Sequence, residues 1–391
     1  MYLPREGAFT LPYTGESSAL RVGAVYRCVR LLSESVASLP VQFMHRRGEV
    51  FVPDMAGRLH YLLNVQPDAA CSAFDFWRGV VQHVLLDGNA YIVPVCDGSG
   101  EISRLVLCSR RSVHHDTVLD TYTVDDTWNL LRGVFDEPEV IHIKGPAFND
   151  PKHGCGVLEY ARLTAATAAA GDRETHKRFA KGGNVRGILS NDRSSGGSFG
   201  MYKTAELDKA AASMDERLSA GENILGVPGD SRFQQLTMSS SDMQFLESRK
   251  FTVVEICRFF GVHPSFVYGD TAGSNYKSVE QANVAFLSHT LNPLLRSIES
   301  ELLRKLVPAG RAHRYRVQFD RRGLYACDLD SRVRYQTQTL AAGIYTINDW
   351  RREENKEPVA GGDTVLVSAN LRGIAELGAP ASSEQNQASD I

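Results

Sequence analysis

The chain has 391 residues, of which 43% are hydrophobic and 23% are charged, so it is long enough for two or three ordinary cores. Its formal net charge of −3 argues against a tight, sequence-reading nucleic-acid binder, because such proteins carry a basic excess that neutralises phosphates. The seven cysteines are odd in number and form no CxxC pair, which argues against a zinc site and a disulfide framework. Buried thiols in a reducing compartment are expected instead.

The N-terminus predicts an extended arm and no targeting segment. Residues 1 to about 20 are polar and rich in Gly, Pro and Thr, without the basic start and apolar run of a signal peptide. No window approaches the roughly 20 apolar residues of a membrane span. We therefore expect no membrane partner.

Residues 21–156 predict a mixed α+β domain. Apolar residues recur at helical spacing after Val22, and Pro40 ends that helix. A second helix over 73–86 ends at Asp87-Gly-Asn, which is typical of a helix stop. Short strands are expected at 41–44, 90–95, 102–107, 118–124 and 140–144.

Two helices flank the middle of the chain. The first, over about 157–180, is rich in Ala and ends at Gly182-Gly183, so it should pack closely against neighbours. The second, over 241–260, begins with the Ser-x-x-Gln form of a capping box. Between them we expect strands at 185–189, 223–227 and 233–238 and a helix at 204–218.

The last third begins with a polar loop. Gly261-Val-His-Pro ends the preceding helix, and Ser278 caps a long helix that Pro293 should kink before it ends near Val307. A strand at 313–319, a helix at about 330–342 and a helix capped by Thr346 follow. Residues 379–391 show no pattern and predict a disordered tail.

A metal-dependent hydrolase or nuclease would have to use His114, His115 and Asp116, with His142 or His153 as further ligands. Adjacent strand residues face opposite ways, so a surface turn between strands is the favoured interpretation. No Walker A pattern, GxGxxG after a strand, HExxH or GxSxG elbow is present. The sequence thus predicts no enzyme and no cofactor.

A basic cluster leaves two interpretations open. It can contact phosphate or an acidic neighbour, or it can be a solvated strand edge protected by charge. Its members are Arg311, Arg314, Arg316, Arg321 and Arg322.

Several phrases in chain order resemble one family. They are Gly23-Ala-Val-Tyr-Arg-Cys-Val-Arg, Asp87-Gly-Asn-Ala-Tyr, Phe179-Ala-Lys-Gly-Gly-Asn, Asp242-Met-Gln-Phe-Leu-Glu-Ser-Arg-Lys, Glu255-Ile-Cys-Arg-Phe-Phe-Gly-Val-His-Pro, Thr290-Leu-Asn-Pro, Ala342-Gly-Ile-Tyr-Thr-Ile-Asn-Asp and Pro358-Val-Ala-Gly-Gly-Asp. Over roughly residues 20–370 the chain resembles the portal proteins of siphovirus-type tailed double-stranded DNA phages. Its departures are small, such as His263 where a small or apolar residue is more usual and Asp349 where Glu is common.

The resemblance implies a multi-domain α+β portal fold of wing, stem, clip and crown that assembles as a closed ring, typically of about twelve subunits. By position, the parts would be the wing with its N-terminal arm (1–156), a stem helix (157–183), the clip (184–239), a second stem helix (240–262), the tunnel loop, long helix and return to the wing (263–328), the crown (329–378) and the tail (379–391).

The resemblance also implies the residues of each working surface. The tunnel loop facing DNA would comprise Asp270, Thr271, Ala272, Gly273, Ser274, Asn275, Tyr276 and Lys277. The stem would present Arg173, Lys177, Arg249 and Lys250. The clip would dock the terminase through Asn191, Asp192, Arg193, Asp230 and Arg232.

The implied partners are other copies of the chain, double-stranded DNA bound without sequence preference, large terminase, major capsid or scaffold protein, and the head-tail connector. The implied location is the portal vertex of the virion, after assembly in the bacterial cytoplasm. Besides the hydrolase, a non-viral α+β scaffold protein stays open as an alternative.

Overall fold

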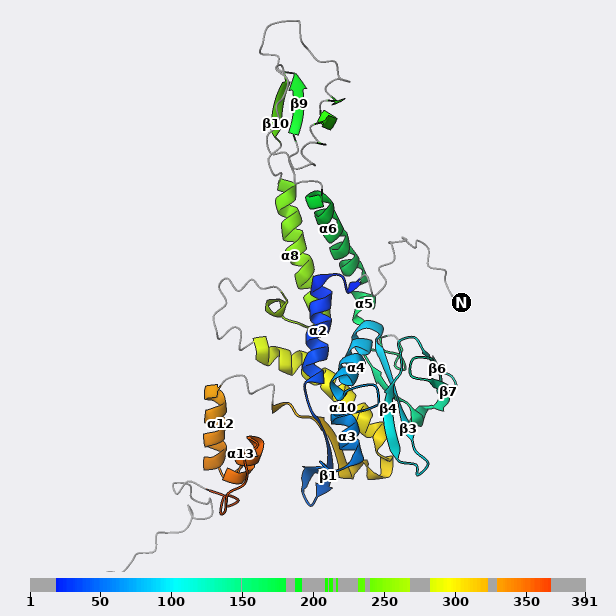
Figure 1. Cartoon of the computed structure of the whole chain (residues 1–391), viewed down its shortest axis with the longest axis vertical. Helices are drawn as coiled ribbons and strands as arrows, with labels where there is room; N and C mark the ends of the chain where they lie inside the picture. Colours follow the sequence, from blue (N-terminus) through cyan, green and yellow to red (C-terminus); the bar gives the residue numbers. More distant parts are fainter. Residues whose placement is uncertain are drawn as a thin grey trace, which may run out of the picture. The chain divides into compact units, whose positions relative to one another are not determined.

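The structure is a computed structural model, and it describes residues 19–148, 150–180, 187–191, 208–209, 211–213, 216, 231–235, 240–267, 282–322 and 329–366. Figure 1 traces the chain and labels its elements. The chain divides into two compact units, residues 1–320 and 321–391, which are described separately. Helix and strand are mixed in the first unit, as the sequence predicts.

The first core of this unit lies where two helices pack together. Helix α2 (Gly23–Ala37) buries one side against α4 (Ala73–Asp87), which Ser72 caps by accepting a hydrogen bond from the Asp75 N–H. Trp77 of α4 is 2% exposed, and its ring meets Phe76 and Phe319 edge to face at centroid distances of 5.2 and 5.5 Å. Its indole N–H donates to the Leu63 carbonyl at 2.9 Å, so the polar end of the side chain is also satisfied.

A sheet joins the start of this unit to its end. Strands β1 (Val41–Arg47), β2 (Val50–Pro53) and β11 (Tyr315–Phe319) lie in the order β11-β1-β2, with Val41 opposite Phe319. Helix α10 (Asn292–Leu306) packs on β11, and α3 (Arg58–Asn64), which the sequence pattern did not predict, packs on β1 and α4.

A second core fills the space between two further antiparallel sheets. One has the order β4-β3-β8, with bounds Ile102–Leu107, Asn89–Cys96 and Ile141–Lys144. The other has the order β5-β6-β7, with bounds Val113–Asp116, Thr121–Asp126 and Leu131–Asp136. The core residues are Val93, Val106, Cys108, Tyr122, Val124, Leu131 and Val140.

The strand expected at 118–124 begins too early. The Asp116 carboxylate accepts hydrogen bonds from the N–H groups of Val118 and Leu119 and makes a turn there. Val118 and Leu119 are 90% and 71% exposed. Because both residues are apolar, the sequence pattern wrongly placed them in a strand. The turn expected at His114–Asp116 is strand β5 instead, and β7 was not predicted.

The helix expected over 157–180 is two helices. The backbone leaves the helical conformation at Ala161 (φ −81°, ψ 5°), between α5 (Val157–Tyr160) and α6 (Arg162–Ala180). The hairpin of β9 (Gly187–Asn191) and β10 (Ser231–Gln235) is antiparallel. The strand expected at 223–227 lies outside the described residues.

The later helices agree closely with the sequence pattern. Helix α8 spans Ser240–Phe260, and the kink expected at Pro293 coincides with a π-helical segment, η3 (Phe286–Leu291), just before α10. Proline lacks an N–H and its ring collides with the carbonyl four residues earlier, so a wider turn there relieves the clash. Short 3-10 turns lie at η1 (Glu137–Glu139), η2 (Pro264–Phe266) and η4 (Ala309–Arg314).

The second unit contains α12 (Leu329–Ala341) and α13 (Ile347–Glu353). Thr346 and Asp349 form a capping box at the start of α13, as the sequence predicts for Thr346. Trp350 packs between Tyr335 and Tyr345, and the buried Asn348 amide binds the Val359 backbone and the Asp363 carboxylate. A side chain at Gly362 would collide with Asn348, which accounts for the Gly-Gly-Asp phrase.

Candidate functional site

The candidate site is the helix pair α6 and α8, which lie side by side in Figure 1 and contact each other. Arg249 of α8 reaches α6, where its guanidinium pairs with Asp172 and donates to the Thr175 hydroxyl. The Arg249 and Asp172 side chains are 36% and 45% exposed, so this ion pair lies at a solvated edge and stabilises the helix pair only modestly.

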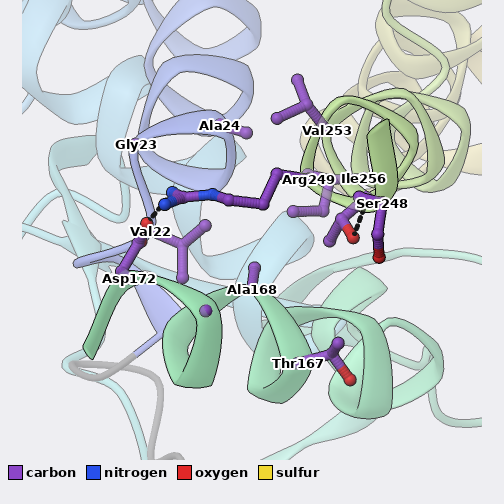
Figure 2. A pocket seen from close by; sticks show the side chains of 12 residues that line it. Val22, Gly23, Ala24, Thr167, Ala168, Asp172, Ser248, Arg249, Val253 and Ile256 are labelled. Atoms are coloured by element: carbon purple, nitrogen blue, oxygen red, sulfur yellow. Dashed lines mark hydrogen bonds and ion pairs between the residues drawn. The ribbon is translucent and has the colours of Figure 1, made fainter. Parts of the chain in front are cut away.

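A cavity of about 300 Å³ lies where α2 meets this pair. Figure 2 shows Arg249 crossing it toward Asp172, with Val22 and Ala168 beneath. Most of the lining is small or apolar: Val22, Gly23, Ala24, Thr167, Ala168, Gly171, Asp172, Ser248, Arg249, Thr252, Val253 and Ile256. Small side chains on α2 and α6 therefore leave a hollow that the Arg249 side chain crosses but does not fill.

The end of α8 anchors the helix pair to the first core. Ile256, Cys257 and Phe260 are buried there, and Cys257 lies against Cys28 of α2. The hydrogen bond with Cys257, together with burial, raises the pKa of the Cys28 thiol. The described cysteines are all free, but only Cys28, Cys108 and Cys257 are buried and Cys96 is exposed, so the expectation of buried thiols holds for some of them.

The predicted stem residues differ in their surroundings. Arg249 is paired across the helices, while Lys250 and Arg173 are exposed on α8 and α6. The Arg173 Nε–H donates to the Ala169 carbonyl at 3.3 Å. Lys177 lies in the part of α6 whose side chains are not described.

The predicted clip and tunnel-loop residues are mostly outside the described residues. Asn191 ends β9 opposite Ser231, and Arg232 lies in β10 opposite Ser190, both known from the backbone alone. Asp192, Arg193 and Asp230 lie outside the described residues, as does the whole loop 270–277. Both surfaces remain sequence-based expectations.

The His114-His115-Asp116 candidate does not form a site. The two histidines lie on opposite faces of β5, with His114 exposed and His115 buried, and Asp116 is engaged in the turn described above. Within the described ranges, no group of three His, Cys, Asp or Glu side chains is arranged to hold a metal ion. This geometry does not favour the hydrolase alternative.

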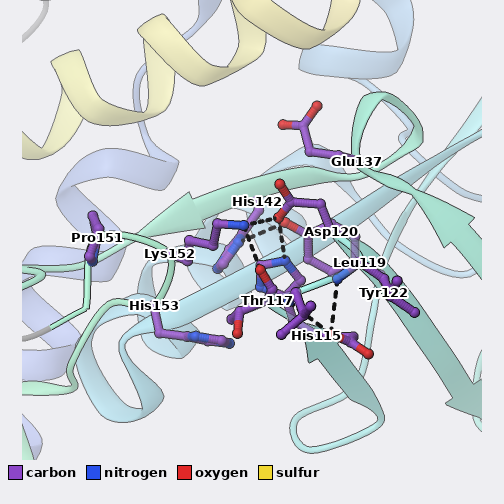
Figure 3. Close-up of polar contacts among 12 residues, drawn as sticks. His115, Thr117, Leu119, Asp120, Tyr122, Glu137, His142, Pro151, Lys152 and His153 are labelled. Atoms are coloured by element: carbon purple, nitrogen blue, oxygen red, sulfur yellow. Dashed lines mark hydrogen bonds and ion pairs between the residues drawn. The ribbon is translucent and has the colours of Figure 1, made fainter.

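His115 instead meets His142 and His153 in a packed cluster (Figure 3). Its ring stacks on Tyr122 at 4.1 Å, and the Tyr122 hydroxyl lies 3.2 Å from His142 Nδ1. Because burial lowers the pKa of His142 to about 2, that imidazole stays neutral. The cluster is a packing contact between strands β5, β6 and β8 and the loop that carries His153.

The basic cluster separates into different environments. Arg316 lies over the Phe51 ring at 4.4 Å, and Arg311 and Arg314 are exposed. In the second unit, Arg322 pairs with Glu353 at 3.1 Å. Arg311, Arg314 and Arg316 therefore fit the interpretation of a solvated edge, and Arg322 that of an acidic neighbour.

Sequence reasoning missed the cavity and one exposed aromatic residue. Asp172 and Gly171, which lie beside Arg249, were not singled out. Phe251 was not singled out either, although it is 59% exposed on α8. A helical projection of α8 would have placed it away from the buried Ile256.

None of the described helices is both long and apolar enough to cross a membrane.

Known proteins resemble the chain along nearly its whole length. It is 27% identical to the portal protein of Enterobacteria phage HK97, covering 96% of this chain and 90% of that protein. It is 29% identical to the probable portal protein of Streptomyces phage phiC31, covering 92% and 80%.

Solved structures share the fold. A crystal structure of an HK97 family phage portal protein from Corynebacterium diphtheriae matches with a TM-score of 0.54 at 18% identity, covering 80% of this chain and 98% of that one. A chain from the neck of a native gene transfer agent particle, computed with C12 symmetry, matches with a TM-score of 0.57 at 21% identity, covering 89% and 95%.

The family described as phage portal protein matches residues 23–355, which include both cores, the α6–α8 pair and both described helices of the second unit, α12 and α13. The match confirms the resemblance to portal proteins that the sequence phrases indicate. The chain belongs to the phage portal protein family.

Proposed function

We propose that the chain is one subunit of a ring-shaped portal at a capsid vertex, through which double-stranded DNA is packaged and ejected. The observation that carries this proposal is the family match over residues 23–355. The C12 symmetry of the gene transfer agent neck supports a ring of twelve subunits.

The α6–α8 pair is suited to packing around a ring. A closed ring needs contacts between unlike faces of identical subunits, and the small side chains of α6 allow a neighbouring helix to come close. A chain of net charge −3 also suits DNA that must slide, because strong neutralisation of phosphates would hold it in place.

The division into parts is proposed by position. Residues 1–156 would form the wing, 157–183 and 240–262 the stem, 184–239 the clip and 329–378 the crown, with the tail from 379. Residues 263–328 would hold the tunnel loop at 270–277, the long helix and the return to the wing, where β11 pairs with β1. The clip residues named above would dock the terminase.

The proposed ring performs no chemistry of its own. A separate terminase would supply the ATPase, the head-tail connector would follow it, and the capsid or scaffold protein would surround the ring. We propose that the ring assembles in the bacterial cytoplasm and ends in the virion.

Electron microscopy of the purified full-length protein tests the ring directly. We expect closed rings with a central channel, and class averages should reveal a rotational symmetry near twelve. A parallel sample with scaffold and capsid proteins covers the case in which assembly needs those partners. A protein that stays monomeric in both samples contradicts the proposal.

A further inference from the structure

Helix α8 exposes a large apolar side chain on the side opposite its anchor. Phe251 is 59% exposed, whereas Ile256, Cys257 and Phe260 are buried. The Arg258 guanidinium lies over the Phe251 ring, 6.0 Å from its centroid, and pairs with Glu255, yet more than half of Phe251 stays exposed. A single exposed phenylalanine is ordinary on a protein surface and does not by itself mark a contact.

The second observation is the cavity between α2, α6 and α8, which lies on another face of the same helix. Ser248, Thr252 and Ile256 line it, and Phe251 falls within that span of the sequence, so the two features lie at the same height along α8. At 3.6 residues per turn, Phe251 points about 130° around α8 from the centre of the five α8 residues that line the cavity.

This arrangement fits the geometry of a ring. Rotation about the ring axis moves a subunit to its neighbour without any shift along the axis, so a protrusion and its matching hollow must have the same height. They must also face widely different directions, because each subunit touches one neighbour on either side. If α8 runs roughly along the axis, both conditions are met.

The cavity also matches the chemistry of a phenyl ring. Its lining is mostly small or apolar, and the two charged members, Arg249 and Asp172, pair with each other. The edge residues Gly23, Thr167 and Ser248 are exposed, so the hollow reaches the surface. Its volume of about 300 Å³ has room for one aromatic side chain.

We propose that Phe251 of one subunit inserts into the α2–α6–α8 cavity of the next subunit. The proposal rests on the proposed ring and names the contact that closes it. The occupant is therefore a second copy of this chain.

Cross-linking between two single variants tests the contact. Chains with Phe251→Cys and differently tagged chains with Ala168→Cys are co-expressed as full-length proteins and oxidised. We expect a reducible dimer containing both tags in the mixture and none with either variant alone. Because each chain carries one change, such a dimer must join two chains, and the unsubstituted protein reports the background from its seven cysteines.

Two further variants separate insertion from folding. Gly171 lines the cavity, and a Cβ added there meets no atom within 4 Å, so the side chain of Gly171→Leu starts in open space and should occupy the cavity. The change also improves helix propensity. We expect Gly171→Leu and Phe251→Ala to raise the subunit concentration needed for rings at least tenfold. Phe251→Leu, which stays apolar, should change it much less.

The outcomes distinguish this contact from the ring itself. Absence of rings in the unsubstituted protein contradicts the proposed function. Rings that form normally, yet give no mixed dimer and tolerate both Gly171→Leu and Phe251→Ala, overturn the insertion and leave the portal function standing.

Discussion

The core around Trp77 and the α6–α8 pair are built in opposite ways. Around Trp77, large side chains from α4, β11 and α2 are almost fully buried, among them Phe76, Phe319 and Leu32. Among the described side chains of α6, only Ala165 is buried. Helix α6 borders a cavity, whereas the centre of the first core is filled by the Trp77 ring. A core closed by its own residues needs no partner, whereas helices that meet through small side chains leave surface for another chain.

The difference assigns separate tasks to the two regions. The Trp77 core can hold the fold of an isolated subunit, because its apolar and polar groups are both satisfied within the chain. The helix pair depends on that core through Ile256 and Phe260 at the end of α8. Substitutions in the two regions should therefore affect different measurements.

Trp77→Ala should have the largest effect on the stability of the subunit. The change removes a buried ring and its hydrogen bond to Leu63, and such truncations cost about 3–5 kcal/mol. Urea unfolding monitored by circular dichroism should show an earlier midpoint. The matched control is Trp128→Ala, since Trp128 is 89% exposed and its loss should change stability by less than about 0.5 kcal/mol. Equal effects of the two changes would contradict a closed core at Trp77.

Asp126, the last residue of β6, provides a second test with a smaller expected effect. This residue is 1% exposed, and its carboxylate accepts hydrogen bonds from the Ser109 N–H at 2.6 Å and the Asn129 side-chain amide at 2.7 Å. Asp126→Asn keeps the shape but faces an amide donor toward other donors, which should cost about 2 kcal/mol near neutral pH.

The pH dependence of that loss has a definite sign. Burial alone would raise the pKa of Asp126, but the hydrogen bonds from Ser109 and Asn129 bring it below the ordinary value of 3.8. A lowered carboxyl pKa contributes stability above the unfolded value, and that contribution is lost as the pH falls through the folded value. Between about pH 5 and about pH 3, the unsubstituted protein should lose more stability than Asp126→Asn. Parallel pH profiles would show that Asp126 is not held as a carboxylate.

The sequence predicted most helices and several strands because their apolar residues repeat with the period of the element. The sequence pattern did not predict β5, because Asp116 turns the chain directly after it. The pattern also did not predict β7, where Arg132, Val134 and Asp136 are exposed and no alternation marks a buried face. One of the phrases that carried the family resemblance, Asp87-Gly-Asn, marks a close approach of two backbone segments. Gly88 has φ +80° at the end of α4, and a side chain there would collide with the backbone of Cys155.

The candidate site was harder to predict than the fold. The order of the phrases pointed to the stem helices, and Arg249 was named, but its partner Asp172 lies 77 positions earlier in the sequence. A cavity has no sequence signal at all, because it depends on where three helices leave space. The sequence pattern did not single out Phe251, and only its exposure in the folded chain separates it from the buried side of α8.

The Arg249–Asp172 pair should have the smallest effect on the isolated subunit. Both side chains are about two-fifths exposed, so a double-mutant cycle of Arg249→Met and Asp172→Asn should give a coupling of about 0.5 kcal/mol, falling with added salt. The methionine keeps most of the aliphatic stem that covers the cavity, and the cycle removes effects that each change has alone. If the coupling were several kcal/mol, the ion pair itself would hold α6 against α8, and the helix pair would be self-sufficient in the way the Trp77 core is. A weak coupling agrees instead with helices that gain their full stability only when a neighbouring chain packs against them.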